Sequence, residues 1–209
     1  MGDLSTLDQL VDPANAAVVI VDMQNDYCHP DGAFAKDGHD IAMVETMLPR
    51  LATFLERARE AGVHLVFIRM LHDDDHSSGP MRERQGRLRV GSDYPRPDTW
   101  GAELCKPLTM RAGDVEFTKY RYGAFTNADL EPYLREKGIQ SLIFTGVATN
   151  VCVESTAREA FMRDFYVVVA RDCVAACYEH THNGSLENLE HHFGRVVPAS
   201  EIEGAWERR

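Results

Sequence analysis

Apolar, often β-branched runs alternate along the chain with stretches in which apolar residues recur at helical spacing. The first run, residues 16–21, is apolar at every position, which is typical of a parallel strand covered on both faces. Further runs predict strands at 63–68, 115–117, 141–145, 166–170 and 195–197. Between them, periodicity and capping residues predict helices over 41–61, 127–137, 151–163 and 179–193. This alternation predicts a three-layer α/β/α fold, in which a six-stranded, mostly parallel sheet has helices on both faces.

Two segments interrupt the regular alternation. Pro49 lies inside the helix predicted over 41–61 and is expected to kink or split it, because proline removes a backbone donor. Residues 70 to 113 show no strong periodicity and hold much of the proline, glycine and arginine, so they are predicted to form a long, functional insertion. We expect the 209 residues to form a single domain.

Composition and charge argue against several classes of protein. Hydrophobic residues make up 44% of the chain, and no apolar run approaches the roughly 20 residues that a membrane span requires. The net charge of −11 disfavours binding to nucleic acid or to anionic lipid. Because residues 1–8 lack the basic end and long apolar stretch of a secretory signal, we expect a soluble, cytoplasmic protein.

The cysteines are scattered and form no CxxC pair; they are Cys28, Cys105, Cys152, Cys173 and Cys177. An odd and dispersed set fits reduced thiols better than a disulfide framework or a zinc site. One reactive thiol among inert ones is therefore a reasonable expectation.

A local basic cluster lies in the insertion and consists of Arg82, Arg84, Arg87 and Arg89. Two interpretations stay open. Such runs are usually solvated and form salt bridges at the surface. Alternatively, the arginines form a wall of the entrance to a substrate site.

Reactive side chains follow three of the predicted strands, at the point where each strand ends. Asp22 closes the first strand, Lys119 follows the third, and Cys152 lies just after the fourth, where a helix begins. Because ligands bind at the carboxyl ends of strands in an open parallel sheet, these residues are expected to converge at one edge. Each also has a structural interpretation, as a helix cap, an exposed lysine or an inert core cysteine.

Together the three side chains predict a cysteine nucleophile with its own base. A helix N-terminus and a nearby cation favour a thiolate, and Cys152 is expected to have both. Asp22 would accept the thiol proton and return it to the leaving nitrogen, while Lys119 stabilises the thiolate and keeps Asp22 ionised. The backbone N–H groups of Ala148 and Cys152, in the strand-to-helix turn, are predicted to form the oxyanion hole.

Three segments closely resemble the catalytic segments of the isochorismatase-like hydrolases. They are VVIVDMQND at 18–26, TKYRYGAF at 118–125 and TGVATNVCVEST at 145–156. The resemblance covers about residues 14 to 200, with the three segments in the same order. It implies the six-stranded sheet, a triad of Asp22, Lys119 and Cys152, and a homodimer or homotetramer. It also implies a cis peptide bond between Val147 and Ala148.

Within this family, segment 145–156 and the pair Arg121-Tyr122 look most like the hydrolases of ureidoacrylate, biuret and triuret. The resemblance points to the linear C–N amide bond of a small ureido or carbamoyl compound, cleaved through a thioester. It also implies that Tyr122 faces the substrate, although a packed aromatic side chain is an equal interpretation. Further candidates for lining the substrate pocket are Gln24, Phe125 and Val147.

Other functions compete with this interpretation. A nicotinamidase or another small-amide amidase of the same family would use the same triad. A non-catalytic binding module is disfavoured because all three triad positions are occupied. Cleavage of isochorismate itself is disfavoured by Cys152, since the vinyl-ether hydrolases of this fold keep the aspartate and lysine but lack the cysteine.

The loop after the second predicted strand resembles a cluster of metal ligands. Metal-dependent nicotinamidases place one aspartate and two histidines there, and His72 and His76 have a similar spacing. The aspartate, however, is replaced by Met70, which is a poor ligand for zinc or manganese. Unless one of the aspartates at 73–75 substitutes, a ligand is missing. We therefore predict neither a metal nor another cofactor.

Overall fold

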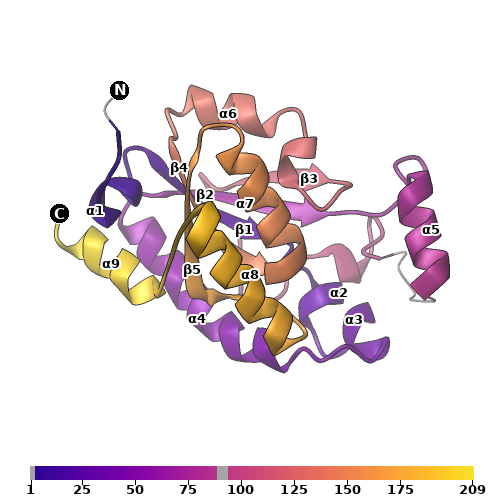
Figure 1. Cartoon of the computed structure of the whole chain (residues 1–209). Helices are drawn as coiled ribbons and strands as arrows, with labels where there is room; N and C mark the ends of the chain where they lie inside the picture. The colour runs from indigo at the N-terminus through magenta and orange to yellow at the C-terminus, as the bar shows by residue number, and fades with distance from the viewer. Residues whose placement is uncertain (1–2, 89–93) are drawn as a thin grey trace.

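The computed structural model describes residues 3–88 and 94–209, and a six-stranded sheet forms its centre (Figure 1). All neighbouring strands are parallel, in the order β3-β2-β1-β4-β5-β6. The strands are β1 (Ala16–Val21), β2 (His64–Met70), β3 (Val115–Lys119), β4 (Ser141–Val147), β5 (Tyr166–Ala175) and β6 (Gly194–Val197). The predicted sheet is confirmed, and it is entirely parallel.

Helices cover both faces of the sheet and so confirm the three layers. The main ones are α4 (Ala42–Glu60), α6 (Leu130–Glu136), α7 (Glu154–Phe161), α8 (Glu179–His192) and α9 (Ala199–Glu207). Helices α4 and α9 pack on one face together with the short α1 (Leu7–Leu10), and α6, α7 and α8 pack on the other. No helix in the described part of the chain is long and apolar enough to cross a membrane.

Strand β1 shows why an unbroken apolar run predicted a central strand. All its residues are buried, and alternate side chains enter the two hydrophobic cores on opposite faces of the sheet. Val21, its last residue, pairs with Ile68 of β2 and with Gly146 of β4. The residues that follow β1, β2 and β4 therefore emerge at the same edge.

The proline in α4 does not split the helix. Helix α4 runs through Pro49 without a break, although the proline ring removes one donor from the backbone ladder. Buried residues on both sides of it, including Val44, Met47 and Leu51, hold the helix against the sheet. Burial of this apolar face outweighs the lost hydrogen bond.

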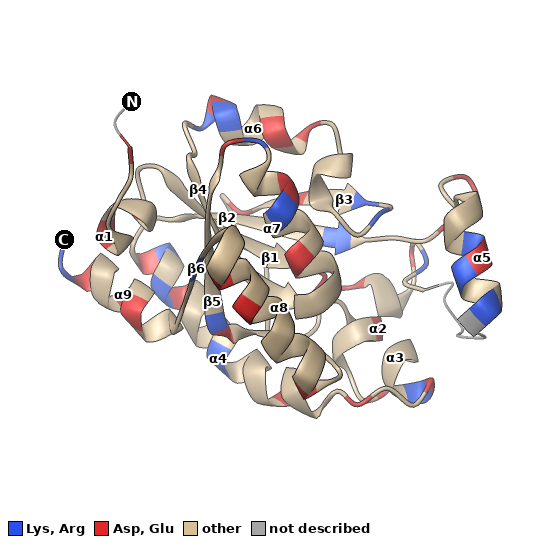
Figure 2. Cartoon of the chain, in the orientation of Figure 1, with Lys and Arg blue, Asp and Glu red and all other residues tan. Residues whose placement is uncertain are grey.

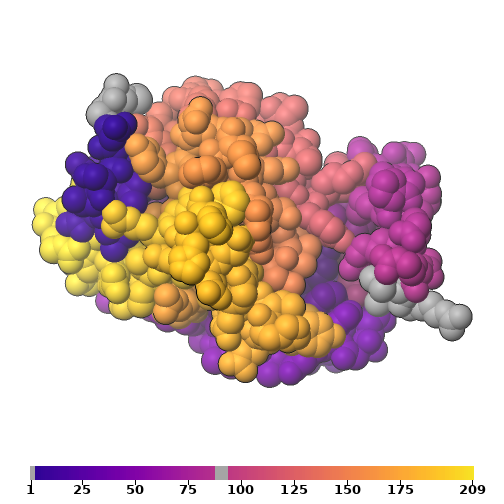
Figure 3. Space-filling view, viewed as in Figure 1, coloured from indigo at the N-terminus to yellow at the C-terminus, as the bar shows by residue number. Residues whose placement is uncertain are grey.

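The insertion, residues 70 to 113, contains a helix that periodicity does not predict. Helix α5 (Gly79–Leu88) protrudes from the edge of the molecule (Figures 1 and 3). Its basic and acidic residues, Arg82, Glu83, Arg84 and Arg87, make it strongly polar (Figure 2). Because it has no apolar stripe, the periodic signal that identifies an amphipathic helix is missing. Two further short helices, α2 (Asn25–Cys28) and α3 (Ala33–Lys36), lie near it in the fold.

Two C-terminal elements are longer than predicted or absent from the prediction. Strand β5 continues beyond Ala170 to Ala175, with a register shift against β4, even though residues 171 and 172 are charged and exposed. Helix α9 follows β6 and buries Ala199, Ile202 and Trp206 at helical spacing. The charged pair in β5 is accommodated because the irregular part of the strand turns it outwards.

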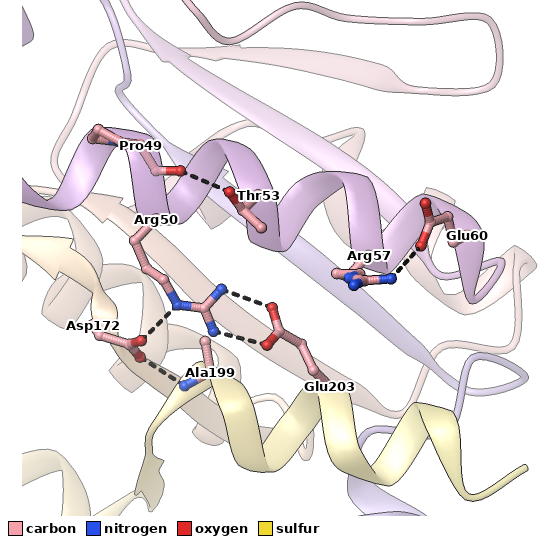
Figure 4. A network of polar contacts seen from close by, with 8 residues as sticks. All are labelled: Pro49, Arg50, Thr53, Arg57, Glu60, Asp172, Ala199 and Glu203. Atoms are coloured by element: carbon pink, nitrogen blue, oxygen red, sulfur yellow. Dashed lines mark hydrogen bonds and ion pairs between the residues drawn. The ribbon is translucent and has the colours of Figure 1, made fainter.

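Arg50 connects this irregular part of β5 to two helices (Figure 4). From α4, its Nε donates to Asp172 Oδ2 at 2.8 Å, and Nη1 and Nη2 donate to the two carboxylate oxygens of Glu203 in α9 at 2.7 and 3.0 Å. Asp172 Oδ1 also accepts the backbone N–H of Ala199 at 2.6 Å. One guanidinium therefore fixes the irregular part of β5 against α4 and α9.

We expect the substitution Arg50→Met to lower the free energy of unfolding by about 1–3 kcal/mol, because it removes several charge-assisted hydrogen bonds from a partly buried group. Urea denaturation followed by circular dichroism measures the change. Arg57→Met on the same helix is the matched control, since the one ion pair that Arg57 forms with a described residue is an exposed contact with Glu60. That variant should lose less than about 0.5 kcal/mol. Equal losses would mean that the Arg50 network contributes no more than a surface ion pair.

Candidate active site

The fold brings together the three reactive side chains predicted from the strand ends. Asp22 directly follows β1, Lys119 is the last residue of β3, and Cys152 lies in the turn after β4. Lys119 Nζ donates to Asp22 Oδ2 at 2.7 Å, and both side chains are almost fully buried. Lys119 reaches across β2, where its Nζ lies 3.5 Å from Met70 Sδ. Asp22 and Cys152 line one cavity at this edge of the sheet.

The backbone around Asp22 is tightly constrained. Asp22 has a φ of 52°, which is uncommon for a residue with a side chain, and its N–H donates to Ile68 O at 2.9 Å. On the neighbouring strand, Gly146 has a φ of 99°, and a Cβ there would lie 2.2 Å from Val21 O. Only glycine allows β4 to approach the end of β1 so closely. This approach places the turn that holds Cys152 beside Asp22.

Burial and charge determine the protonation of the three groups. Burial raises the pKa of the Asp22 carboxyl, and the positive charge of Lys119 opposes this increase. Burial, followed by the negative charge of Asp22, raises the pKa of the Cys152 thiol, and Lys119 offsets only part of the increase. For Lys119, burial acts to lower the pKa, but Asp22 outweighs it and the pKa lies above its usual value. The buried Lys119–Asp22 ion pair, with Nζ and Oδ2 2.7 Å apart, therefore lies beside a thiol whose pKa is raised.

Two effects in the structure oppose a thiolate at Cys152. The lysine and the helix start favour the thiolate. The loss of water around the buried sulfur and the negative charge of Asp22 both favour the thiol. Because these two effects outweigh that of Lys119, the pKa of the thiol lies above its usual value, and the predicted transfer of its proton to Asp22 assists the attack on a substrate.

Asp22 has an oxygen that is suited to this task. Oδ2 binds Lys119, whereas Oδ1 is buried and accepts no hydrogen bond from any residue that the structure describes. A buried carboxylate oxygen without a donor is costly unless a transient partner supplies a proton. The raised pKa of Asp22 also makes its carboxylate a stronger base than an exposed aspartate.

The turn that carries Cys152 is held from two sides. The helical segment begins with a π-helical turn, Thr149–Val153, and only then continues as α7, which corrects the predicted helix start at 151. Thr149 Oγ1 lies 2.9 Å from Nδ1 of His182 in α8. On the other side, Thr156 Oγ1 donates to Cys152 O at 2.7 Å and accepts the N–H of Ala124 at 3.2 Å. Contacts from α8 and from the loop after β3 thus fix the position of the thiol.

The cis peptide bond between Val147 and Ala148 is confirmed. Val147, Ala148 and Cys152 all line the cavity, so the backbone of this turn faces the space in which a substrate would lie. The arrangement is compatible with the predicted oxyanion hole formed by the N–H groups of Ala148 and Cys152, and that role stays a prediction.

The cavity has a volume of about 230 Å³, and the buried residues Asp22 and Cys152 in its lining mark its inner end. Aromatic side chains form much of its wall: Tyr27, Phe34, Tyr94 and Tyr122. The rings of Tyr27 and Phe34 meet edge to face with centroids 5.7 Å apart, and the Tyr27 hydroxyl donates to Tyr94 O at 3.4 Å. A small, largely apolar space with a few polar groups at one end is typical of a site for a small molecule.

Two of the four predicted pocket residues, Tyr122 and Val147, line this cavity. Gln24 does not: its amide donates to Met70 O and Ala102 O, and its Oε1 accepts the N–H of Met70 at 2.9 Å. Phe125 is also buried elsewhere, in the core below α7, where its ring packs against Phe165. Both predictions relied on closeness to the triad in sequence, and both side chains point away from the cavity into protein.

Tyr122 was the one member of this aromatic wall that was predicted. Tyr27 and Phe34 belong to the short helices α2 and α3, and Tyr94 comes from the insertion. Helices of one turn have no periodic pattern, so nothing in the sequence indicates which way their side chains point. The position of Tyr27 just after the segment 18–26 was the one available signal.

The arginines of α5 fit both earlier interpretations, a substrate entrance for one residue and a solvated surface for others. Arg84 lines the cavity, as the entrance interpretation predicted. Arg82 Nη1 donates to Ser77 O at 2.5 Å, and Arg87 Nε lies 3.2 Å from Glu83 Oε1, as expected of surface arginines. Arg89 lies outside the described residues.

The histidines of the suspected metal loop have separate surroundings. His72 lines the cavity. His76 stacks on Tyr120 with ring centroids 3.6 Å apart, and its Nδ1 lies 2.8 Å from Asp73 Oδ1. Met70, at the position of the missing aspartate, contacts Lys119. Within residues 3–88 and 94–209, no group of three His, Cys, Asp or Glu side chains is arranged to hold a metal ion.

We expect exhaustive chelation to leave hydrolytic activity within about twofold of the untreated protein, because Met70 supplies no ligand for a hard or borderline metal. Metal content measured on the same sample by mass spectrometry is the control. Activity that is lost on chelation and restored by zinc, manganese or iron would contradict this expectation.

Comparison with known proteins supports the relationship that the three segments suggested. Residues 16–201 match the isochorismatase domain. Ureidoacrylate amidohydrolase RutB of Caulobacter vibrioides is 33% identical over an alignment of 209 positions. The alignment covers 94% of this chain and 93% of that protein.

Solved structures show the same fold. A cysteine hydrolase from Pseudomonas syringae pv. phaseolicola 1448A superposes with a TM-score of 0.82 at 26% identity, covering 95% of both chains. The nicotinamidase PncA from Bacillus subtilis superposes with a TM-score of 0.73 at 25% identity, covering 88% of this chain and 99% of that one. The parallel sheet, the residues gathered at its carboxyl edge and the match over most of the sequence show that this chain belongs to the isochorismatase family.

Proposed function

We propose that this protein is a cysteine-dependent amidohydrolase that cleaves a linear C–N bond of a small ureido or carbamoyl compound. The observation that carries the proposal is the set of groups at the inner end of the cavity. A buried thiol, a carboxylate with one oxygen that accepts no hydrogen bond from the described residues and a buried ammonium lie together there. A nucleophile, a base and a fixed positive charge are what acyl transfer from nitrogen requires.

In the first step, Cys152 Sγ attacks the carbonyl carbon of the substrate, and the thiol proton passes to Asp22 Oδ1. The carbonyl oxygen becomes an oxyanion, which the N–H groups of Ala148 and Cys152 stabilise. Asp22 then returns the proton to the leaving nitrogen, the C–N bond breaks and a thioester forms on Cys152. Lys119 keeps its charge throughout and stabilises the carboxylate between the two proton transfers.

In the second step, water attacks the thioester carbon and gives its proton to Asp22. The C–S bond then breaks, and the proton on Asp22 returns to the sulfur, which restores the thiol. The same carboxylate thus serves as base and acid in both steps. The base has a clear role here, because burial and the charge of Asp22 raise the pKa of the Cys152 thiol.

The comparisons favour a ureido compound over nicotinamide. The relative at 33% identity, which matches nearly the full length of both chains, acts on ureidoacrylate. The nicotinamidase has the same fold at 25% identity. Met70 adds a local difference, because it removes a ligand that metal-dependent nicotinamidases are expected to use.

A panel of ureidoacrylate, biuret, triuret, a carbamoyl amino acid and nicotinamide tests the proposal by ammonia release. We expect the ureido and carbamoyl compounds to be hydrolysed and nicotinamide to be at least tenfold poorer in kcat/KM. Cys152→Ala, run in parallel, should release no ammonia from any of them. Nicotinamide as the best substrate would replace the proposed substrate class, and turnover by Cys152→Ala would overturn the cysteine mechanism.

A further inference from the structure

The charge that lines the cavity differs in sign from that of the whole chain. The protein carries a net charge of −11. Among the described residues that line the cavity, Asp22 is the sole acid, and its charge is neutralised by Lys119 at 2.7 Å. The sole lysine or arginine in the same lining is Arg84. Apart from its histidines, the cavity therefore keeps one uncompensated charge, the positive charge of Arg84.

Arg84 belongs to the face of α5 that points into the cavity. Met81, Arg84 and Gln85 all line it, and their spacing of three and four residues places them side by side on one helical face. Arg82 and Arg87 are held by Ser77 and Glu83. The helix thus presents one particular arginine to the cavity.

The guanidinium of Arg84 has no internal partner. It makes no hydrogen bond or ion pair with any residue that the structure describes, and its side chain is exposed. Cys152 and Asp22, by contrast, are buried at the other end of the same space. The cavity therefore offers a nucleophile at its inner end and an unpaired, planar cation at its open end.

We infer that Arg84 determines substrate specificity by binding the carboxylate of an anionic ureido compound whose ureido group lies at Cys152. The inference rests on the proposed function and narrows it from ureido compounds in general to ureido carboxylates. A guanidinium binds a carboxylate through two parallel N–H···O bonds. A neutral substrate such as biuret leaves this cation unused.

A matched pair of substrates tests the inference. 3-Ureidopropanoate and propylurea have chains of the same length, and a carboxylate in the first replaces a methyl group in the second. Hydrolysis of either releases ammonia, so one assay measures both. Ureidoacrylate and biuret extend the comparison to an unsaturated anion and a second neutral compound.

We expect Arg84→Gln to raise KM for the two anions about 10- to 100-fold and to change kcat/KM for the neutral compounds by less than twofold. Arg84→Lys keeps the charge but not the paired donors, and it should recover part of the loss. Arg87→Gln, on the solvent side of the same helix, is the control and should leave KM and kcat/KM unchanged for anionic and neutral compounds. Circular dichroism confirms that each variant is folded.

The outcomes separate this inference from the proposed function. If Arg84→Gln lowers kcat/KM equally for anionic and neutral compounds, or if Arg87→Gln has the same effect as Arg84→Gln, Arg84 does not select the carboxylate. The proposed ureido hydrolase function then remains, and only the role of Arg84 is overturned. If the wild-type protein releases ammonia from none of the four ureido compounds, the proposed function itself fails, and the inference fails with it.

Discussion

Replacing Cys152 with serine is expected to reduce kcat by at least about 10⁴-fold while the fold stays intact. The thiol already has a raised pKa, and a hydroxyl at the same position is far harder to ionise. Asp22 can remove a proton from the thiol during attack, but its basicity falls far short of what an alcohol requires. Ammonia release under single-turnover conditions measures the loss, and circular dichroism checks the fold.

A second cysteine provides the control for this prediction. Cys105 is buried outside the cavity, where its thiol donates to Lys106 O, and it has no contact with the proposed triad. Cys105→Ala should keep activity within about threefold and lose at most a modest amount of stability. Substantial turnover by Cys152→Ser would mean that sulfur chemistry is not required. Mass spectrometry after quenching should also find the acyl adduct on the peptide that contains Cys152.

The part of the fold that the sequence predicts is the part that burial determines. The strands of an all-parallel sheet are covered on both faces, so they appear as unbroken apolar runs such as 16–21 and 142–144. Strand β5 is the exception, since its prediction ended at the charged residues 171 and 172. The structure turns these outwards at a register shift and fixes Asp172 with Arg50, a residue 122 positions away. No local pattern contains that contact.

The convergence of the proposed triad follows from topology, whereas the pocket does not. Parallel strands end at one edge, so the meeting of Asp22, Lys119 and Cys152 could be predicted without any side-chain geometry. The direction in which a side chain points after a strand end depends on local backbone geometry, as the φ of 52° at Asp22 shows. Gln24 and Phe125 were misplaced for this reason. The other three members of the aromatic wall, Tyr27, Phe34 and Tyr94, were missed because they come from distant, irregular segments.

The protonation of Cys152 shows the same limit in energetic terms. The features that favour a thiolate at Cys152, a nearby cation and a helix start, can be identified from the sequence. The effects that oppose a thiolate depend on how completely the protein removes water around the sulfur and on the negative charge of Asp22 beside it. Both can be known only once the fold is in place, and here they outweigh the favourable ones.

Removing the charge of Lys119 is expected to damage both catalysis and stability. In Lys119→Met, Asp22 stays buried without its counter-charge, and breaking a buried pair in this way costs about 3–5 kcal/mol of unfolding free energy. With the main opposing effect removed, burial raises the pKa of Asp22 further, so the carboxyl is protonated and no longer acts as a base. We expect kcat to fall by about 10³-fold or more.

The sign of the pH dependence follows from the same shift. In this variant the folded protein holds a proton on Asp22 that the unfolded chain releases near pH 4. Stability therefore falls as the pH rises above about 4, and it continues to fall until the folded-state pKa is reached. Urea denaturation at several pH values measures this slope against the wild type.

The double variant Asp22→Asn/Lys119→Met separates the structural role of the pair from its catalytic role. Removing both buried charges leaves no unpaired ion, so much of the lost stability should return and the added pH dependence should disappear. Activity should stay as low as in the single variant, because an amide cannot accept the thiol proton. A double variant that regains turnover would show that the pair only supports the fold. A double variant as unstable as Lys119→Met would show that lost packing around the lysine stem, and not the unpaired carboxylate, causes the destabilisation.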